Sequence, residues 1–172
     1  AINKLKRKKI AQVKKLKFNF TPEDVAPILR GLLSENKDNK FILNFRKNNK
    51  LDYFINGKHV KRYGNEGTAT PDHVIRVKPF PLIIEPKENC SLEEFKKIAI
   101  KSFKNYRRKY INYFNANKKK VKEKKTILDT SPRVILVQNL GLFSVGSTLS
   151  ATKIAGDLTE TNARVISSVE ET

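Results

Sequence analysis

The stretch RVILVQNLGLFSVGSTLSATKIAGDL, residues 133–158, decides the fold of this chain. It begins with an unbroken apolar run, residues 134–137, which predicts a buried β-strand. The glycine-bounded stretch at residues 141–146 predicts a tight strand-to-helix turn. Ser147 and Thr148 then predict the start of a helix, because their hydroxyls can cap it. That helix carries apolar residues on one face: Ile154, Leu158, Val165 and Val169.

A strand, a glycine-containing turn and a helix in succession is also the setting of a dinucleotide-binding loop. Such a loop needs three glycines in the pattern Gly-x-Gly-x-x-Gly, so that backbone can approach the pyrophosphate. Here Leu142 and Phe143 fill the loop, and no Walker lysine follows. The sequence therefore favours a structural turn over a phosphate site.

Upstream, Ser91 and Glu94 form a capping box that predicts a helix start. Apolar residues continue from there at steps of three and four to Phe114, which predicts one apolar helix face for over six turns. An aromatic stripe at this spacing favours a core face over a surface for stacking on bases. Residues 115–126 then predict a charged linker.

Nearer the N-terminus, Thr21 and Pro22 predict the start of another helix, which ends near residues 34–36. Residues 41–45 and 51–55 read as a β-hairpin, and two more short strands are predicted at residues 74–77 and 82–84. Residues 2–17 predict a thin, basic amphipathic helix. The pattern predicts an α/β fold, with α+β as the alternative: a central sheet of five to seven strands flanked by helices. We expect residues 1–20 as a basic N-terminal helix and residues 21–172 as a single domain.

The charge of the chain is concentrated in two segments. Lys plus Arg number 36 against 17 Asp plus Glu, a net charge of +19. Most of the excess lies in residues 1–20 and 101–125, where basic residues are interleaved with Phe and Tyr. Such segments can bind nucleic acid, because Lys and Arg neutralise phosphates and aromatic rings stack on bases. A solvated helix face explains the same charges, and we weigh it above nucleic acid. We expect no membrane contact, since neither segment offers a wide apolar face.

Cysteine and histidine are scarce. Cys90 is the one cysteine, and His59 and His73 are the two histidines. An internal disulfide and a three-histidine metal site are therefore both excluded. With no recognisable secretion signal, we expect a cytoplasmic protein. The chain begins with Ala1 and contains no Met, which suggests a fragment of a longer protein.

The group of polar residues that most strongly indicates a binding site lies within residues 68–78, around Pro71. Its candidate substrate-binding residues are Asp72, His73, Arg76 and Lys78. On a strand, Arg76 and Lys78 would share one face and could bind a phosphate, with His73 as a polar or proton-transfer contact. The structural alternative is a tight turn held by hydrogen bonds from Thr70 and Asp72.

The segment GTATPDHVIRVKPFPLII, residues 67–84, resembles the Ala-Thr-Pro-Asp-His-Val-Ile-Arg-x-Lys segment of bifunctional rhamnulose-1-phosphate aldolase/short-chain alcohol dehydrogenases. The segment SPRVILVQNLGLFSVGSTLSATKIAGDLTETNARVI, residues 131–166, is similar to a later stretch of the same proteins, and YRRKYINYF, residues 106–114, lies between the two in family order. The resemblance covers roughly residues 20–170.

The resemblance implies a place between a catalytic aldolase part and a dehydrogenase part. The parent would cleave a ketose 1-phosphate with a divalent metal, zinc, and oxidise or reduce a hydroxy-aldehyde with NAD. It would be a homo-oligomer. In a comparison with class II aldolases, Asn139-Leu140-Gly141 stands where a metal-binding His-Gly would be, which implies a degenerate aldolase-like lobe. This fragment would then hold no metal, cofactor or catalytic residue. It would complete the fold, contact the remainder of the parent chain, or bind a sugar phosphate as a regulatory lobe.

Overall fold

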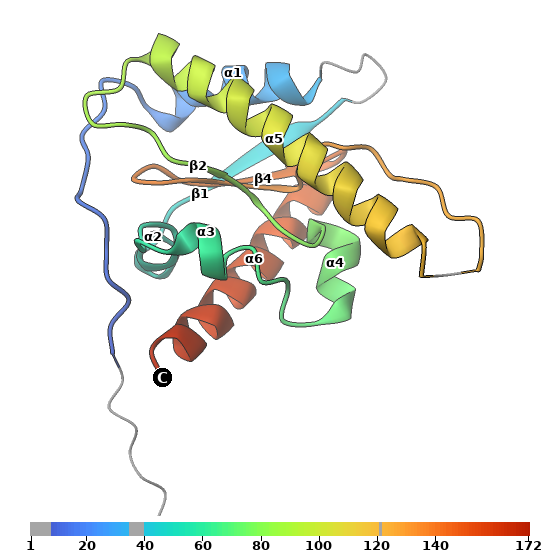
Figure 1. Cartoon of the computed structure of the whole chain (residues 1–172). Helices are drawn as coiled ribbons and strands as arrows, with labels where there is room; N and C mark the ends of the chain where they lie inside the picture. The colour runs from blue at the N-terminus through green and yellow to red at the C-terminus, as the bar shows by residue number, and fades with distance from the viewer. Residues whose placement is uncertain (1–7, 35–39, 121) are drawn as a thin grey trace, which may run out of the picture.

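The computed structural model describes residues 8–34, 40–120 and 122–172, and at its centre lies one mixed four-stranded sheet (Figure 1). The strands are β1 (Ile42–Arg46), β2 (Leu82–Ile84), β3 (Val134–Val137) and β4 (Gly141–Gly146), in the spatial order β1-β4-β3-β2. β4 is antiparallel to both β1 and β3, whereas β2 runs parallel to β3. This confirms the α/β class, although the described residues form four strands and not the five to seven expected.

Helices cover both faces of the sheet. On one side lie α1 (Pro22–Leu33) and α5 (Leu92–Lys118), and on the other lie α2 (Asn49–Ile55), α3 (Val60–Tyr63), α4 (Pro71–Val77) and α6 (Leu149–Glu170) (Figure 1). β3 therefore buries both faces, which explains its continuous apolar sequence. Ile135 and Val137 belong to the core against α1 and α5, whereas Val134 and Leu136 belong to the core on the α6 side. This alternation follows from the two-residue period of a strand.

Polar caps fix the starts of the long helices. Thr21 and Asp24 form a capping box at α1, and Ser91 and Glu94 form one at α5. At α6, the Thr148 hydroxyl accepts a hydrogen bond from the Ala151 N–H at 3.1 Å. The sequence predicted the starts of all three helices, and the structure confirms them.

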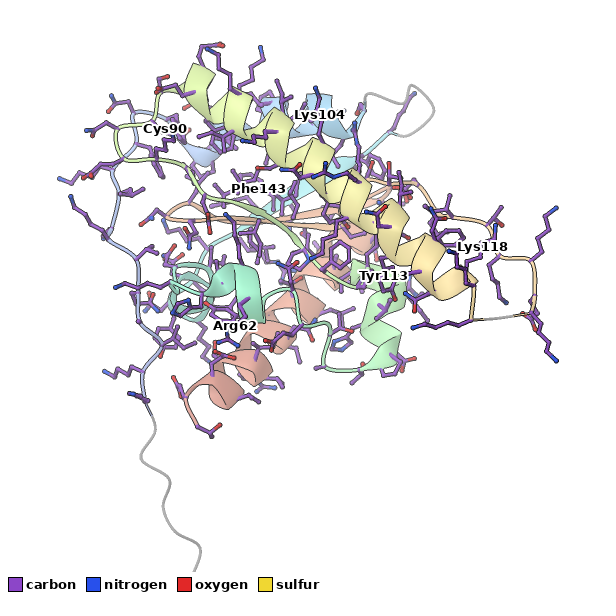
Figure 2. The ribbon with its side chains drawn as sticks, viewed as in Figure 1. Arg62, Cys90, Lys104, Tyr113, Lys118 and Phe143 are labelled. Atoms are coloured by element: carbon purple, nitrogen blue, oxygen red, sulfur yellow. The ribbon has the colours of Figure 1, made fainter. Side chains whose placement is uncertain are left out.

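The predicted hairpin partner at residues 51–55 is wrong, because that segment is part of helix α2. The Asn48 side chain, in the segment between the two predicted strands, accepts hydrogen bonds from the N–H groups of Lys50 and Leu51 and caps the helix. β1 instead pairs with β4, where Phe45 lies opposite Phe143. Figure 2 shows Phe143 at the level of the sheet, between the two helical layers.

The predicted strand at residues 74–77 is also wrong. Those residues lie in α4, which begins at Pro71 after Thr70 in an extended conformation. Pro at the first helical position is preorganised for a helix, and this outweighs the β-branched character of the segment.

The predicted turn at residues 141–146 is strand β4 instead. The tight turn lies just before it, where Asn139 has φ 64° and Gly141 has φ 149°.

The N-terminal segment differs from its predicted helix as well. Residues 1–7 lie outside the described part, and residues 8–20 run in an extended conformation. This segment bonds to the α2–α3 connection: the Val13 N–H donates to the Asn56 carbonyl, and the Lys58 N–H donates to the Ala11 carbonyl, both at 2.7 Å. Its apolar residues are too sparse to hold a helix on the domain, and these backbone bonds take the place of helical ones.

The four apolar residues predicted on one face of α6 do not form its buried face. The residues that α6 buries are small or polar, and include Thr152, Ala155, Gly156, Thr159 and Ala163. Small residues are needed because the helix lies close to β1: a Cβ added at Gly156 would lie 2.5 Å from the guanidinium carbon of Arg46.

Candidate functional site

The polar cluster around Pro71 is spread over helix α4 and its C-terminal end. Asp72 and Arg76 are exposed, His73 is half-buried, and Lys78 is only 3% exposed. The expectation that Arg76 and Lys78 share a strand face is wrong, because Arg76 lies in the last turn of helix α4 and Lys78 follows the helix with a φ of 64°. The structure therefore does not direct all four side chains to one point.

His73 connects α4 to α6 through Asn162. The side-chain oxygen of Asn162 accepts a hydrogen bond from the Ala69 N–H at 2.9 Å and lies 2.9 Å from Nδ1 of His73. Since that oxygen is an acceptor, the contact requires the proton on Nδ1 of His73. This leaves Nε2 as the ring nitrogen that could act on a ligand. Nothing in the local sequence pointed to Asn162, which lies 89 residues from His73.

Lys78 is held in an unusual backbone conformation. Its φ of 64° and ψ of 171° belong to a region that is essentially reserved for glycine. The ammonium group donates to the backbone carbonyl of Asp129, lies 3.6 Å from the Asp129 carboxylate, and lies 4.1 Å from the centre of the Tyr110 ring. These contacts offset both the strain and the burial of the charge.

The electrostatics of this cluster follow from its burial. Burial lowers the pKa of Lys78 to about 8, and Asp129 opposes that shift. Burial alone would raise the pKa of Asp129, but hydrogen bonds from Arg133 and the nearby Lys78 charge lower it. Arg133 donates hydrogen bonds to both carboxylate oxygens of Asp129, and its Nη1 lies 3.0 Å from Oδ1. The cluster therefore fixes the segment after α5 to the end of α4, a link between residues 51 apart that no local pattern indicated.

A small cavity lies beside this cluster, between α4, α6 and β3. Its lining includes Val77, Lys78, Leu136, Thr159 and Asn162, and its volume is about 30 Å³. That is about the space of one water molecule and too small for a sugar phosphate. A phosphate could reach Arg76 from solvent, but it could reach the Lys78 ammonium only if the contacts with Asp129 opened.

The turn at Asn139-Leu140-Gly141 uses its polar groups to hold other segments. The Gln138 side chain donates to the carbonyls of Ile55 and Gly57 at 3.2 and 3.3 Å. The Asn139 N–H donates to the Asn56 side-chain oxygen at 2.7 Å, and the Asn139 side-chain oxygen accepts from the Leu16 N–H at 3.0 Å.

Leu140, which lies between Asn139 and Gly141 in the turn, is buried. Within residues 8–34, 40–120 and 122–172, no group of three His, Cys, Asp or Glu side chains could hold a metal ion.

Helix α5 separates its aromatic residues from its basic ones. Phe95, Phe103, Tyr106 and Tyr110 are buried, which confirms the prediction of a core face as far as Tyr110, whereas Tyr113 is 42% exposed and Phe114 is half-buried. The basic residues on the opposite face are exposed: Lys96, Lys97, Lys101, Lys104 and Arg108. Figure 2 shows Lys104 and Lys118 extending from α5 into solvent. In the part of the chain that the structure describes, none of the helices combines the length and apolar character needed to cross a membrane.

Comparisons with known proteins agree with this architecture. The family model for the second domain of class II aldolases matches residues 21–172. The uncharacterized oxidoreductase YuxG of Bacillus subtilis (strain 168) is 30% identical over 138 residues, which make up 78% of this chain and 19% of that protein. The chain thus spans about a fifth of the length of the curated relative it matches. No solved structure matches the chain. Because the family model covers the sheet and every helix described above, the chain belongs to the family of class II aldolase second domains.

Proposed function

We propose that this chain is a non-catalytic, accessory lobe of a longer sugar-metabolism enzyme, in which a ketose-1-phosphate aldolase is fused to a short-chain dehydrogenase. The observation that carries the proposal is the family match over residues 21–172, taken with a relative that is named an oxidoreductase and is about five times as long as the matched region. In the parent, a zinc-dependent aldolase part would produce a hydroxy-aldehyde, and an NAD-dependent part would act on it.

The β3–β4 turn supports an accessory role. The resemblance implies that Asn139-Leu140-Gly141 stands where class II aldolases have a metal-binding His-Gly. Here the side-chain oxygen of Asn139 accepts a hydrogen bond from the backbone of Leu16. Gln138 beside it is committed to two carbonyls. These side chains stabilise the fold and are not free to bind substrate or metal. Lys78, the lysine of the candidate cluster, has its pKa lowered by burial and is bound to Asp129.

The test uses the full open reading frame that contains this chain. We expect the full protein to cleave a ketose 1-phosphate in the presence of zinc and to reduce NAD with the aldehyde product, and the 172-residue chain alone to do neither. Cleavage by the isolated chain, or neither activity in the full protein, would overturn the proposal.

A variant of the full protein tests whether Asn139 is a structural turn residue or a metal ligand. Asn139→Gly keeps the positive φ accessible but removes the amide. We expect its zinc content, measured by mass spectrometry of the metal-loaded protein, to equal that of the wild type. A loss of zinc from this variant would show that Asn139 ligates the metal.

The basic surface of α5 supports a second candidate, a nucleic-acid-binding module. Its exposed Lys and Arg side chains lie along one helix face, in a chain of net charge +19. Such a surface should bind DNA without sequence preference, and binding should weaken steeply with salt. The triple variant Lys101→Glu, Lys104→Glu, Arg108→Glu should lower the salt slope by about 3, whereas Lys50→Glu on the other side of the sheet should not. A flat fluorescence titration at low salt would rule this candidate out.

A further inference from the structure

Helix α6 carries exposed apolar side chains on its outward face. Ile154, Val165 and Val169 on this face are 37%, 40% and 64% exposed, whereas Leu158 at its edge is half-buried and packs against the core on the α6 side. The face lies on the side of α6 turned away from the sheet, since the residues that pack toward the sheet are Thr152, Ala155, Thr159 and Ala163. Burying so much apolar surface is the main source of favourable free energy in association.

The spacing on this face is that of a helix-pairing seam. The uncharged residues repeat at alternating steps of four and three, in the order Ile154, Leu158, Thr161, Val165 and Ser168. An average step of 3.5 keeps one seam against a neighbouring helix, as in a two-stranded coiled coil. The charged side chains of α6 lie off the seam, at Lys153, Asp157, Glu160, Arg164 and Glu170.

The charges that flank the seam indicate the occupant. Asp157 and Arg164 are seven residues apart, on the same side of the seam. If a second α6 runs antiparallel about a two-fold axis near Glu160, Asp157 of each copy lies opposite Arg164 of the other. The same arrangement brings Ile154 against Val165 and Leu158 against Thr161. Parallel pairing would instead place Asp157 opposite Asn162 and Arg164 opposite Val169 of the other copy, so no opposite-charge pair would form.

Both flanking side chains are available for this contact. Asp157 accepts a hydrogen bond from Arg46 at 2.6 Å, but its side chain remains 69% exposed. Arg164 is exposed and makes no ion pair with the described residues. It lines a groove of about 230 Å³ between α2 and α6 together with Lys50 and Glu160, and Glu160 is already paired with Arg46. The carboxylate of a second copy would therefore meet two positive charges and one negative charge that has its own partner.

We propose that the outward face of α6 pairs with the same face of a second copy of this chain, antiparallel, to form a two-fold symmetric dimer. The interface is isologous, so one patch supplies both halves of the contact. It is an interaction between helix faces and does not depend on the proposed enzymatic role of the parent.

The test is sedimentation equilibrium of the 172-residue chain from about 1 µM to about 500 µM. The buffer has physiological ionic strength, where the Debye length is roughly 8 Å and repulsion between the net charges is screened. We expect the mass to rise with concentration from 19.7 kDa towards twice that value. Val165→Asp should raise the dimer dissociation constant by about tenfold or more. Ile111→Asp on α5 is the matched control, because Ile111 and Val165 are both 40% exposed, and it should leave dimerisation unchanged.

A mixing experiment tests the antiparallel orientation. Asp157→Arg alone and Arg164→Glu alone each place like charges across the seam, so each variant should be monomeric at concentrations where the wild type is a dimer. Mixed together they restore both charge pairs and should associate with each other. Circular dichroism melts of each variant verify folding. A wild-type chain that stays monomeric, equal effects of Val165→Asp and Ile111→Asp, or no association in the mixture would each overturn the proposal.

Discussion

The ammonium group of Lys78 lies 3.6 Å from the carboxylate of Asp129, and both side chains are largely removed from solvent. This contact joins the end of α4 to the segment between α5 and β3. Because Lys78 also has a backbone conformation that only glycine adopts readily, the contact stabilises a conformation that the local chain alone would not keep.

Removing the carboxylate should therefore be costly. We expect Asp129→Asn to lower the free energy of unfolding by about 3 kcal/mol, because it leaves the Lys78 charge buried without a counter-charge. Glu88→Gln is the control: it breaks the Lys14–Glu88 pair, in which both side chains are more than half exposed, and should cost under about 1 kcal/mol. Urea unfolding measures both. Equal effects would show that the Lys78–Asp129 contact contributes no more than a surface pair.

The burial of Lys78 predicts how stability depends on pH. Burial lowers the pKa of Lys78 to about 8, so between that value and its ordinary value of 10.5 the unfolded chain binds more protons than the folded chain. Stability should therefore rise with pH through this window, by up to about 1 kcal/mol per pH unit. Lys78→Met should lose this rise. Urea unfolding of both proteins between pH 7.5 and 9.5 measures the difference, and parallel pH profiles would contradict the assignment.

Two glycines should respond to alanine in opposite ways. Gly141 has φ 149°, and an added Cβ would lie 2.8 Å from the Phe45 ring and 2.9 Å from the Arg46 carbonyl oxygen. Gly141→Ala should cost more than about 2 kcal/mol through strain and overpacking. Gly31 lies inside α1 with nothing within 4 Å of the added Cβ. Gly31→Ala should stabilise the protein by about 0.5–1 kcal/mol, because alanine favours a helix. Thermal melts give both signs directly, and destabilisation by Gly31→Ala would mean that α1 is packed more tightly there than the structure has it.

A sugar phosphate, if it binds this lobe, should depend on the exposed member of the basic pair. Arg76 is open to solvent, whereas Lys78 is bound to Asp129. We expect Arg76→Ala to abolish the rise in melting temperature that a ketose 1-phosphate produces, and Lys78→Met to leave that rise unchanged. If Lys78→Met removed it instead, the Asp129 contact would have to open on binding.

Local signals were sufficient for the long elements. Capping residues and apolar periodicity predicted α1, α5 and α6, and a continuous apolar run predicted β3. The same signals failed for α2 and α4, which are seven residues each. Asn48 caps α2, but an Asn at that place is equally typical of a turn, and α4 starts at Pro71 with no side-chain hydrogen bond from its N-cap Thr70.

The candidate site was harder to predict because its contacts join distant segments. Lys78 could be singled out from its neighbours in the sequence, but its partner Asp129 is 51 residues away. Asn162, which contacts His73, lies on the buried side of α6, where a purely apolar face would be the ordinary expectation. Only the packing of α4 on α6 brings that amide to the imidazole.

The extended N-terminal segment determines how the domain would respond to mechanical force. Its bonds are spaced along the chain, from the Lys8 N–H on the Glu171 carbonyl, through Val13 on Asn56, to Leu16 on the Asn139 side chain. A pull on Lys8 would load these bonds one after another, as in unzipping. A pull along β1, by contrast, would load all its bonds to β4 at once, as in shear. The segment should therefore peel away at low force while the sheet and its helices stay intact, so tension arriving through residues 8–20 would be absorbed before it reached the core.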